Sequence, residues 1–218
     1  MERRSPMAGR VRRLPAALLM LAVACGGGTS TSLEYEDPNQ SAIFEIPREW
    51  HLYEADELTA VPTLPFVTDF GTQLSVVSKV GFDGATGRDV ANLDVAISNA
   101  EYPVGSMVIR AVGSAERDLL SRNLLESAVI HTQAYTTSTN SGIAEDFRFD
   151  TGYEGIRRFV SFQAQESEDQ GIAYYISVTN PDDSRIYTMA AGCSIACFET
   201  YRDRILEVVD SWLVNTRQ

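Results

Sequence analysis

Residues 185–212 read RIYTMAAGCSIACFETYRDRILEVVDSW. The first part, 185–191, follows a polar turn and is typical of a buried strand. From 195 to 214 apolar residues recur at helical spacing, which predicts an amphipathic helix with one face against a core. That stripe comprises Phe198, Tyr201, Ile205, Val208, Val209 and Trp212. A strand that leads directly into such a helix indicates a sheet with the helix packed on it.

The segments upstream of this stretch predict further strands of the same sheet. Residues 143–149, 156–164 and 173–179 alternate in polarity or are rich in β-branched and aromatic residues. In 156–164, Arg157 and Phe159 fall on one face and Arg158 on the other. The polar turns between the last three strands are short, so these strands must be antiparallel neighbours.

The first half of the chain adds strands and a second helix. Residues 42–50, AIFEIPREW, predict a strand that ends at Pro47, and further strands are expected at 74–80, 93–97 and 107–112. Ser114 is expected to cap a helix whose apolar face comprises Leu120, Leu124, Leu125, Ala128 and Val129. The expected fold class is therefore α+β, an antiparallel sheet packed by two amphipathic helices.

The amino-terminal segment has the features of an export signal. Arginines precede the apolar run LPAALLMLAVAC at 14–25, which is too short to span a bilayer. Residues 21–25, LAVAC, resemble the lipobox of bacterial lipoprotein precursors, in which the cysteine becomes the acylated mature amino terminus. The resemblance implies a signal peptide at 1–24 and a lipid on Cys25. The alternative is a cleaved signal peptide and full secretion, and the export route, general or twin-arginine, stays open.

The domain boundaries follow from composition. Residues 25–40 are rich in Gly, Ser and Thr and are expected to form a flexible tether. Residues 41–218 are expected to fold as a single globular domain, since the 194 residues after position 24 suit one domain with an ample core.

The charge of the mature part restricts its partners. Five of the 18 basic and one of the 30 acidic residues precede position 25, so the rest of the chain has 13 basic and 29 acidic residues, a formal charge of −16. Such a surface repels nucleic acid and anionic lipid headgroups. The partners expected are the membrane, through the lipid on Cys25, and an envelope protein or glycan.

Cys193 and Cys197 are the two remaining cysteines. Four helical steps place their Cα atoms roughly 6 Å apart, within the range that a disulfide requires. An exported protein meets an oxidising compartment, so a structural disulfide is expected. Free thiols and a redox or metal role are the alternatives, although C-x-x-C spacing is absent.

Other candidate sites carry weaker signals. His51 and His131 have no companion at metal-ligand or catalytic spacing. The loop GFDGATG at 81–87 lacks the spacing of a phosphate-binding loop and is expected to be a hairpin turn. Acidic clusters lie at Glu54, Asp56 and Glu57, at Glu166, Glu168 and Asp169, and at Asp182 and Asp183. They are expected to be solvated turn residues.

The element order resembles the PsbP-like and Mog1-like domains. Ile46, Pro47 and Trp50 match the start of that pattern, a strand feeding a helix near 107–130 matches its middle, and Ser211-Trp212 matches its end. The resemblance implies an α/β/α sandwich that acts mostly without catalysis, as an assembly factor, adaptor or binding module. Several bacterial members are lipoproteins.

These observations lead to one expected function and two alternatives. The expected function is a non-catalytic, lipid-anchored binding or assembly module on the extracytoplasmic face of the bacterial cell membrane, with no cofactor and no catalytic residue. One alternative is a cell-envelope hydrolase that acts on glycan or lipid through carboxylates distant in the chain. The other is an acidic accessory protein that binds divalent metal ions.

Overall fold

The structure, a computed structural model, describes residues 31–39, 41–60, 66, 75–117, 125, 135–137, 144–164 and 169–214. All of them belong to one compact unit that begins at Thr31. The proposed signal peptide and Cys25 lie outside the described residues, as do His131, Glu166 and Glu168.

The larger of two sheets contains eight of the described strands in the order β3-β4-β5-β10-β9-β8-β6, with β7 also paired to β8. Every pairing is antiparallel, and the hairpins β8-β9 and β9-β10 are those expected from the short polar turns. The bounds are β3 (His51–Tyr53), β4 (Ser75–Asp83), β5 (Val104–Ala111), β6 (Tyr135–Thr137), β7 (Glu145–Arg148), β8 (Glu154–Ala164), β9 (Gln170–Thr179) and β10 (Arg185–Ser194).

The smaller sheet joins strands from both ends of the folded unit. It consists of β1 (Ser32–Glu36), β2 (Ala42–Pro47) and β11 (Leu213–Val214), in the order β1-β2-β11. β1 lies within the segment expected to be tether, and its five residues pair in register with β2. The described strands therefore include one that lies about ten residues before the domain boundary that the composition suggested.

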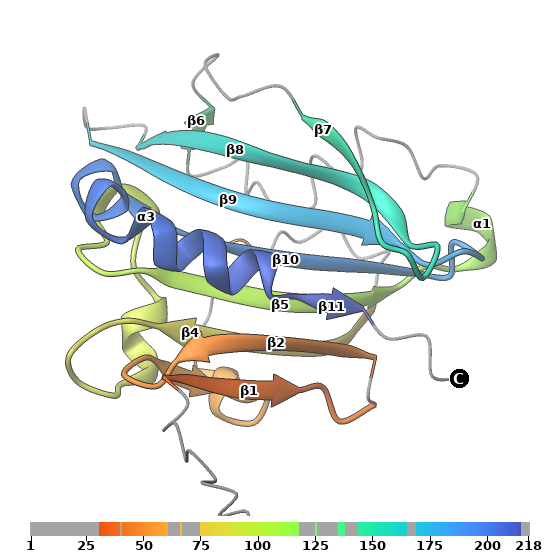
Figure 1. The fold of residues 1–218 in the computed structure, drawn as a ribbon, viewed down its shortest axis with the longest axis horizontal. Coiled ribbons are helices and arrows are strands. Elements are labelled where there is room, and N and C mark those ends of the chain that lie inside the picture. The colour runs from red at the N-terminus through yellow and green to blue at the C-terminus, as the bar shows by residue number, and fades with distance from the viewer. Residues whose placement is uncertain are drawn as a thin grey trace, which may run out of the picture. The chain divides into compact units, whose positions relative to one another are not determined.

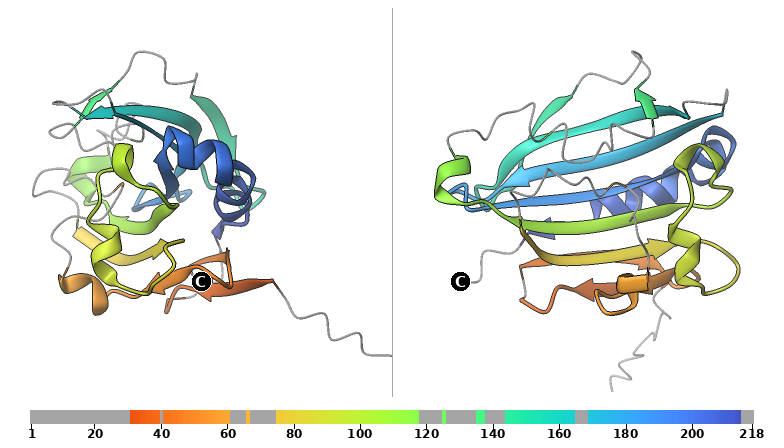
Figure 2. Two further views of the ribbon diagram at one scale, coloured as in Figure 1. Left: turned by 90° about the vertical axis from the view of Figure 1, so that its left-hand side faces the viewer. Right: turned by 180° about the vertical axis from the view of Figure 1, so that it is seen from behind.

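The helix α3 (Ile195–Asp210) covers one face of the larger sheet. Figure 1 shows it lying across β9 and β10, and Figure 2 shows it on a single side of the strands. The Ser194 hydroxyl caps the helix by accepting a hydrogen bond from the Cys197 backbone N–H. Its buried residues, Cys197, Phe198, Ile205, Val208 and Val209, follow the apolar stripe read from the sequence.

α3 ends four residues earlier than its periodicity predicts. Ser211 caps the helix, the Trp212 side chain is 1% exposed, and Leu213 and Val214 pair with β2 instead of continuing the helix. Apolar residues that were expected to extend the helix thus complete the small sheet, in which residues 213–214 pair with β2.

Two further differences concern the first half. Residues 93–97, expected as a strand, lie across two 3-10 helices, η3 (Val90–Leu93) and η4 (Ile97–Asn99), because Asp89 caps a helical turn through the Ala91 N–H. Of the first predicted helix, α1 (Ser114–Arg117) and the buried helical residue Leu125 are described. The rest of that prediction lies outside the described residues. A further 3-10 helix, η1, spans Glu57–Ala60.

The core joins the helix, the larger sheet and the small sheet in one cluster of buried side chains. At the contact between the two sheets, Phe82 of β4 packs against Phe44 of β2, with ring centroids 5.8 Å apart, and stacks on Trp50 at 6.1 Å. All three rings are buried. The fold is of the α+β class, as the sequence predicts, with mostly antiparallel sheets and α3 as the one described helix longer than a turn.

Candidate functional site

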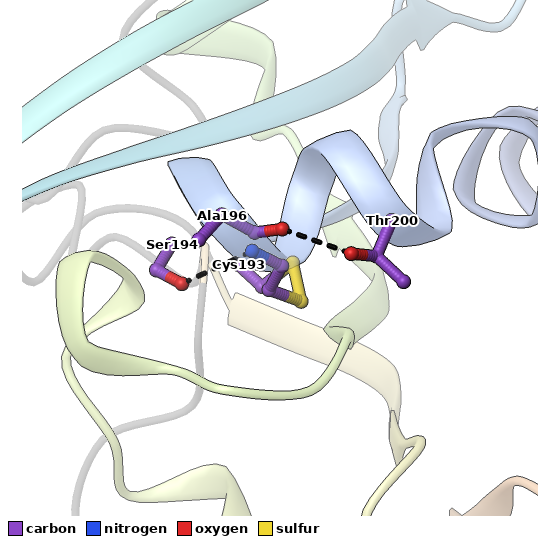
Figure 3. The surroundings of a disulfide bond; sticks show 5 residues. Cys193, Ser194, Ala196 and Thr200 are labelled. Atoms are coloured by element: carbon purple, nitrogen blue, oxygen red, sulfur yellow. Dashed lines mark hydrogen bonds between the residues drawn. A yellow bond between two sulfur atoms is a disulfide. The ribbon is translucent and has the colours of Figure 1, made fainter.

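The two cysteines after the last long strand form a disulfide, as their spacing predicts. Cys193 lies near the end of β10 and Cys197 in the first turn of α3, with Cα atoms 5.8 Å apart. Figure 3 shows the bond at this junction of strand and helix, beside Ser194. Both side chains are buried, at 0% and 5% exposure. Because the sulfurs are bonded and shielded, we assign the pair a structural role in fixing where α3 starts.

His51 and the glycine-rich loop at 81–87 are not arranged as a catalytic or phosphate-binding site. The His51 Nε2 atom is buried and has no hydrogen-bond partner, so no described side chain uses it as a base. Residues 81–87 form no tight hairpin, because β4 runs on to Asp83 and the connection to β5 contains η3 and η4. The buried Asp83 carboxylate accepts hydrogen bonds from the Tyr53 hydroxyl at 2.7 Å and the Ala85 N–H at 2.8 Å.

The described acidic clusters lie in turns and ion pairs. Glu57 forms an ion pair with Arg88 at 2.8 Å, and Asp182 accepts a hydrogen bond from the Ser184 hydroxyl at 2.8 Å in the turn between β9 and β10. Within the described ranges, no group of three or more His, Cys, Asp or Glu residues is arranged to hold a metal ion.

A groove between α3 and the β7-β8-β9 side of the larger sheet is the strongest candidate for a binding site. Its volume is about 480 Å³, and we call it the α3–β8 groove. It is lined by Glu145, Arg157, Arg158, Phe159, Tyr174, Arg202, Leu206 and Asp210. Three arginines, two carboxylates and three apolar or aromatic side chains thus converge from one helix and three strands.

Helical and strand periodicity place these side chains. Arg202, Leu206 and Asp210 follow one another at intervals of four residues, which puts them in one row along α3. On β8, Arg157 and Phe159 are two residues apart and share the face that α3 covers. The Phe159 ring contacts Phe198 of α3 edge to face, with centroids 6.1 Å apart.

One side of the groove is held by an ion pair. Arg157 and Glu145 are directly opposed in the β7-β8 register, and the Arg157 Nε donates to Glu145 Oε2 at 2.9 Å. The guanidinium also lies 5.6 Å above the centroid of the Phe147 ring. Because both side chains are about half exposed, the pair contributes little to stability, but it orients the Arg157 side chain.

The other side is held by a buried tyrosine. The Tyr174 hydroxyl donates to Asp210 Oδ1 at 2.9 Å, and the ring stacks on Phe159 with centroids 4.7 Å apart. Burial, followed by the hydrogen bond to Asp210, raises the pKa of Tyr174 to about 12. The tyrosine is therefore neutral in the physiological range and acts as a fixed donor to the helix.

Arg202 is the cation of this groove that is left available. It is exposed, and its side chain forms no ion pair or hydrogen bond with any residue that the structure describes. Arg157 is already paired with Glu145 and Asp210 accepts from Tyr174, so the groove presents a guanidinium beside the aromatic and aliphatic surface of Phe159 and Leu206.

A second groove, of about 540 Å³, lies on the other side of α3 against β2. Its lining is Thr31, Ser32, Glu45, Ile46, Pro47, Glu49, Arg204, Glu207, Val208 and Ser211. Arg204 forms an ion pair with Glu49, and the Ser211 hydroxyl accepts a hydrogen bond from the Glu45 N–H at 2.9 Å. Arg204 is thus engaged, and the hydrogen bond between Glu45 and Ser211 joins β2 of the small sheet to the end of α3.

Sequence reasoning did not find the α3–β8 groove. Its signal was present in part, since the row of Arg202, Leu206 and Asp210 interrupts an apolar helix with a cation, an aliphatic residue and an anion at one spacing. The partner strand could not be chosen from periodicity, because Arg157 is far from this helix in the chain and meets it only through the sheet order.

Comparisons with known proteins concern the fold. No family model and no characterised protein matches the sequence. The chain is similar in structure to cyanobacterial PsbP (CyanoP) from Synechocystis sp. PCC 6803, at 14% identity and a TM-score of 0.46, over 89% of this chain and 99% of that one.

Two further structures are similar at comparable levels. The Ran-binding protein Mog1p of Saccharomyces cerevisiae has 10% identity and a TM-score of 0.43, over 84% of this chain and 95% of that one. LpqN, involved in cell envelope biogenesis of Mycobacterium tuberculosis, has 9% identity and a TM-score of 0.44, over 84% and 90%.

No helix that the structure describes is both long and apolar enough to cross a membrane.

Proposed function

We propose that this protein is a non-catalytic binding module of the bacterial cell envelope, anchored by lipid on Cys25, which holds a ligand in the α3–β8 groove. The observation that carries the proposal is the groove itself. Its volume of about 480 Å³ falls within the range of small-molecule sites, and its lining combines apolar side chains with a few polar ones.

The groove's contacts favour holding a ligand over transforming it. Glu145 is paired with Arg157, and Asp210 accepts a hydrogen bond from Tyr174, so neither carboxylate stands free as a base. The ring stack of Phe159 and Tyr174 is supported from below by Phe198. Side chains locked in this way on a helix and a sheet present a preformed surface, which lowers the entropy lost on binding.

The anchor is supported by the sequence and by where the folded unit begins. β1 begins at Ser32, so residues 26–31 separate Cys25 from the first strand that the structure describes. Six residues reach at most roughly 21 Å when fully extended. The lipid would hold the domain close to the bilayer, although the −16 charge of the mature part opposes adhesion through the protein surface.

The anchor is tested by membrane fractionation of Cys25→Ala. Without the acylated cysteine, most of the protein should move from the membrane pellet to the soluble extracytoplasmic fraction. The matched control removes two other cysteines, Cys193→Ala with Cys197→Ala, and should stay in the pellet. Unchanged fractionation of Cys25→Ala would refute the lipid anchor.

The binding site is tested by native mass spectrometry of the protein purified from its own membranes. A bound small molecule should be present in the wild type and lost in Leu206→Arg, which fills the groove. Leu213→Arg, at an apolar residue of β11 that is 57% exposed and does not line this groove, is the matched control and should keep the molecule. If no molecule is bound, or if both variants lose it equally, the groove is not the binding site.

A further inference from the structure

We infer that the ligand of the α3–β8 groove is an amphiphile with one anionic head group, which Arg202 binds, and an apolar body that lies on Phe159 and Leu206. This inference rests on the proposed binding function and adds the chemical class of the ligand.

The head group follows from the charges that line the groove. Arg157 has its carboxylate partner in Glu145, 2.9 Å away, whereas Arg202 has no partner among the described residues. An exposed guanidinium on a helix row that also lines a groove is suited to a carboxylate or phosphate, which it binds through two parallel N–H donors. Arg158, the third arginine of the lining, has an interaction of its own within the protein, so Arg202 is the uncommitted positive site among the described lining residues.

The neighbouring carboxylates limit the ligand to a single negative charge. Glu145 and Asp210 both line the groove and are both exposed, so a second anionic group would meet a like charge. The protein surface as a whole also repels anions, because the mature part carries a formal charge of −16. Long-range attraction cannot collect anions here, and recognition must come from direct contact.

The apolar body follows from the remaining lining. Phe159 and Leu206 are partly buried and line the same groove as Arg202 and Arg157. Each methylene that a ligand buries on this surface favours binding through the hydrophobic effect. A hydrophilic anion would gain nothing from these two side chains, whereas an acyl or aryl chain would cover them.

Such a ligand could be a free fatty acid or an anionic phospholipid, and the test separates these sources. The probe is laurate, titrated by calorimetry into the purified full-length chain carrying Cys25→Ala, with dodecanol and dodecyltrimethylammonium at equal concentration. Vesicles containing phosphatidylglycerol form a second arm, scored by co-sedimentation. Laurate should bind at least ten-fold more tightly than either uncharged or cationic analogue; vesicle binding with no laurate binding would assign the head group to a phospholipid.

Two arginine variants test the role assigned to Arg202. Arg202→Gln should weaken laurate binding about ten-fold or more, as loss of a charge-assisted hydrogen bond predicts. Arg204→Gln, two residues along α3, changes the same charge in the second groove and should alter the affinity less than two-fold. The thermal midpoint of both variants is measured to show that they fold.

Several outcomes overturn the inference. Equal affinity for dodecanol and laurate would show that the ligand needs no anionic head group. Equal losses of laurate affinity in both arginine variants would show that Arg202 has no specific role in binding. If neither laurate nor the vesicles bind, yet native mass spectrometry still finds a molecule that Leu206→Arg displaces, the ligand class is wrong and the binding function stands. If that molecule is absent too, both proposals fail.

Discussion

Gly105→Ala should destabilise the contact between the two sheets. Gly105 lies in β5, directly opposite Phe82 of β4 and Ala191 of β10. A Cβ at this position would be 2.2 Å from Phe82 Cζ and 2.6 Å from the Ala190 carbonyl oxygen. Carbon atoms normally approach to about 3.5–4.0 Å, so the Phe82 ring would have to move by more than about 1 Å.

Displacing the Phe82 ring costs free energy, because its surroundings are tightly packed. Phe82 is fully buried and is held between Phe44 and Trp50, at centroid distances of 5.8 and 6.1 Å. Overpacking of a tight core costs about 1–3 kcal/mol, and the clash with the Ala190 carbonyl adds to it because the backbone is fixed by two neighbouring strands. We expect a loss of about 3 kcal/mol in the free energy of unfolding.

The assay is thermal and urea unfolding, followed by circular dichroism and by tryptophan fluorescence, to which Trp50 contributes. A loss of this size should lower Tm by about 6–12 °C. Gly87→Ala is the matched control, since nothing lies within 4 Å of its Cβ position, and its Tm should stay within about 2 °C of the wild type. Adding Phe82→Leu to Gly105→Ala should recover part of the loss, because a smaller side chain frees the space under the strand.

Two outcomes would refute this reasoning. One is a Gly105→Ala protein whose Tm equals that of the wild type, which would mean that Phe82 and the neighbouring strand can move aside at no cost in stability. The other is an equal loss in Gly87→Ala, which would assign the effect to the glycines' backbone freedom instead of to the packing of Phe82.

The remaining predictions concern the disulfide and the buried tyrosines. The variant with both Cys193→Ala and Cys197→Ala should lose about 2 kcal/mol, the value for so short a closed loop, and its melting curve should no longer respond to reductant. Burial is the largest cause that raises the pKa of Tyr35, Tyr153 and Tyr174 to about 12 each. The folded-state pKa of each tyrosine is raised above the ordinary value near 10. The stability that the neutral tyrosines contribute is therefore complete below pH 10 and is lost as the pH rises from 10 to 12. Urea midpoints measured between pH 8 and 11.5 should fall in that window and fall less steeply in Tyr174→Phe; a flat profile would contradict the linkage.

Local patterns in the sequence predicted much of the sheet. The alternation in 156–164 and the polar turns on either side of 173–179 were enough to predict β8, β9 and β10 as antiparallel neighbours, because a short turn leaves a strand no other partner. The four-residue spacing of Cys193 and Cys197 likewise predicted their disulfide, although the spacing was taken as helical and the structure places Cys193 in β10 and Cys197 in α3, with Cα atoms 5.8 Å apart.

Prediction failed where a residue's partner lies far along the chain. The apolar stripe of α3 continues through Val214, yet helix and strand compete for these residues, and pairing with β2 ends the helix at Asp210. The polar segment before position 41 looked like tether, although residues 32–36 form β1 once β2 is beside them. The β-propensity of a segment does not include the effect of a partner strand that lies far along the chain.

By itself, the sequence determined the fold class, the last three long strands, the helix that follows them and the disulfide between strand and helix, since each depends on spacing within a few residues. It also predicts the lipid on Cys25, which fractionation can test. Only the tertiary structure decided that β5 lies beside β10 and that Arg157 meets the row of Arg202 and Leu206. Periodicity states which face of an element is apolar, but the element that covers this face is chosen by packing across the whole chain.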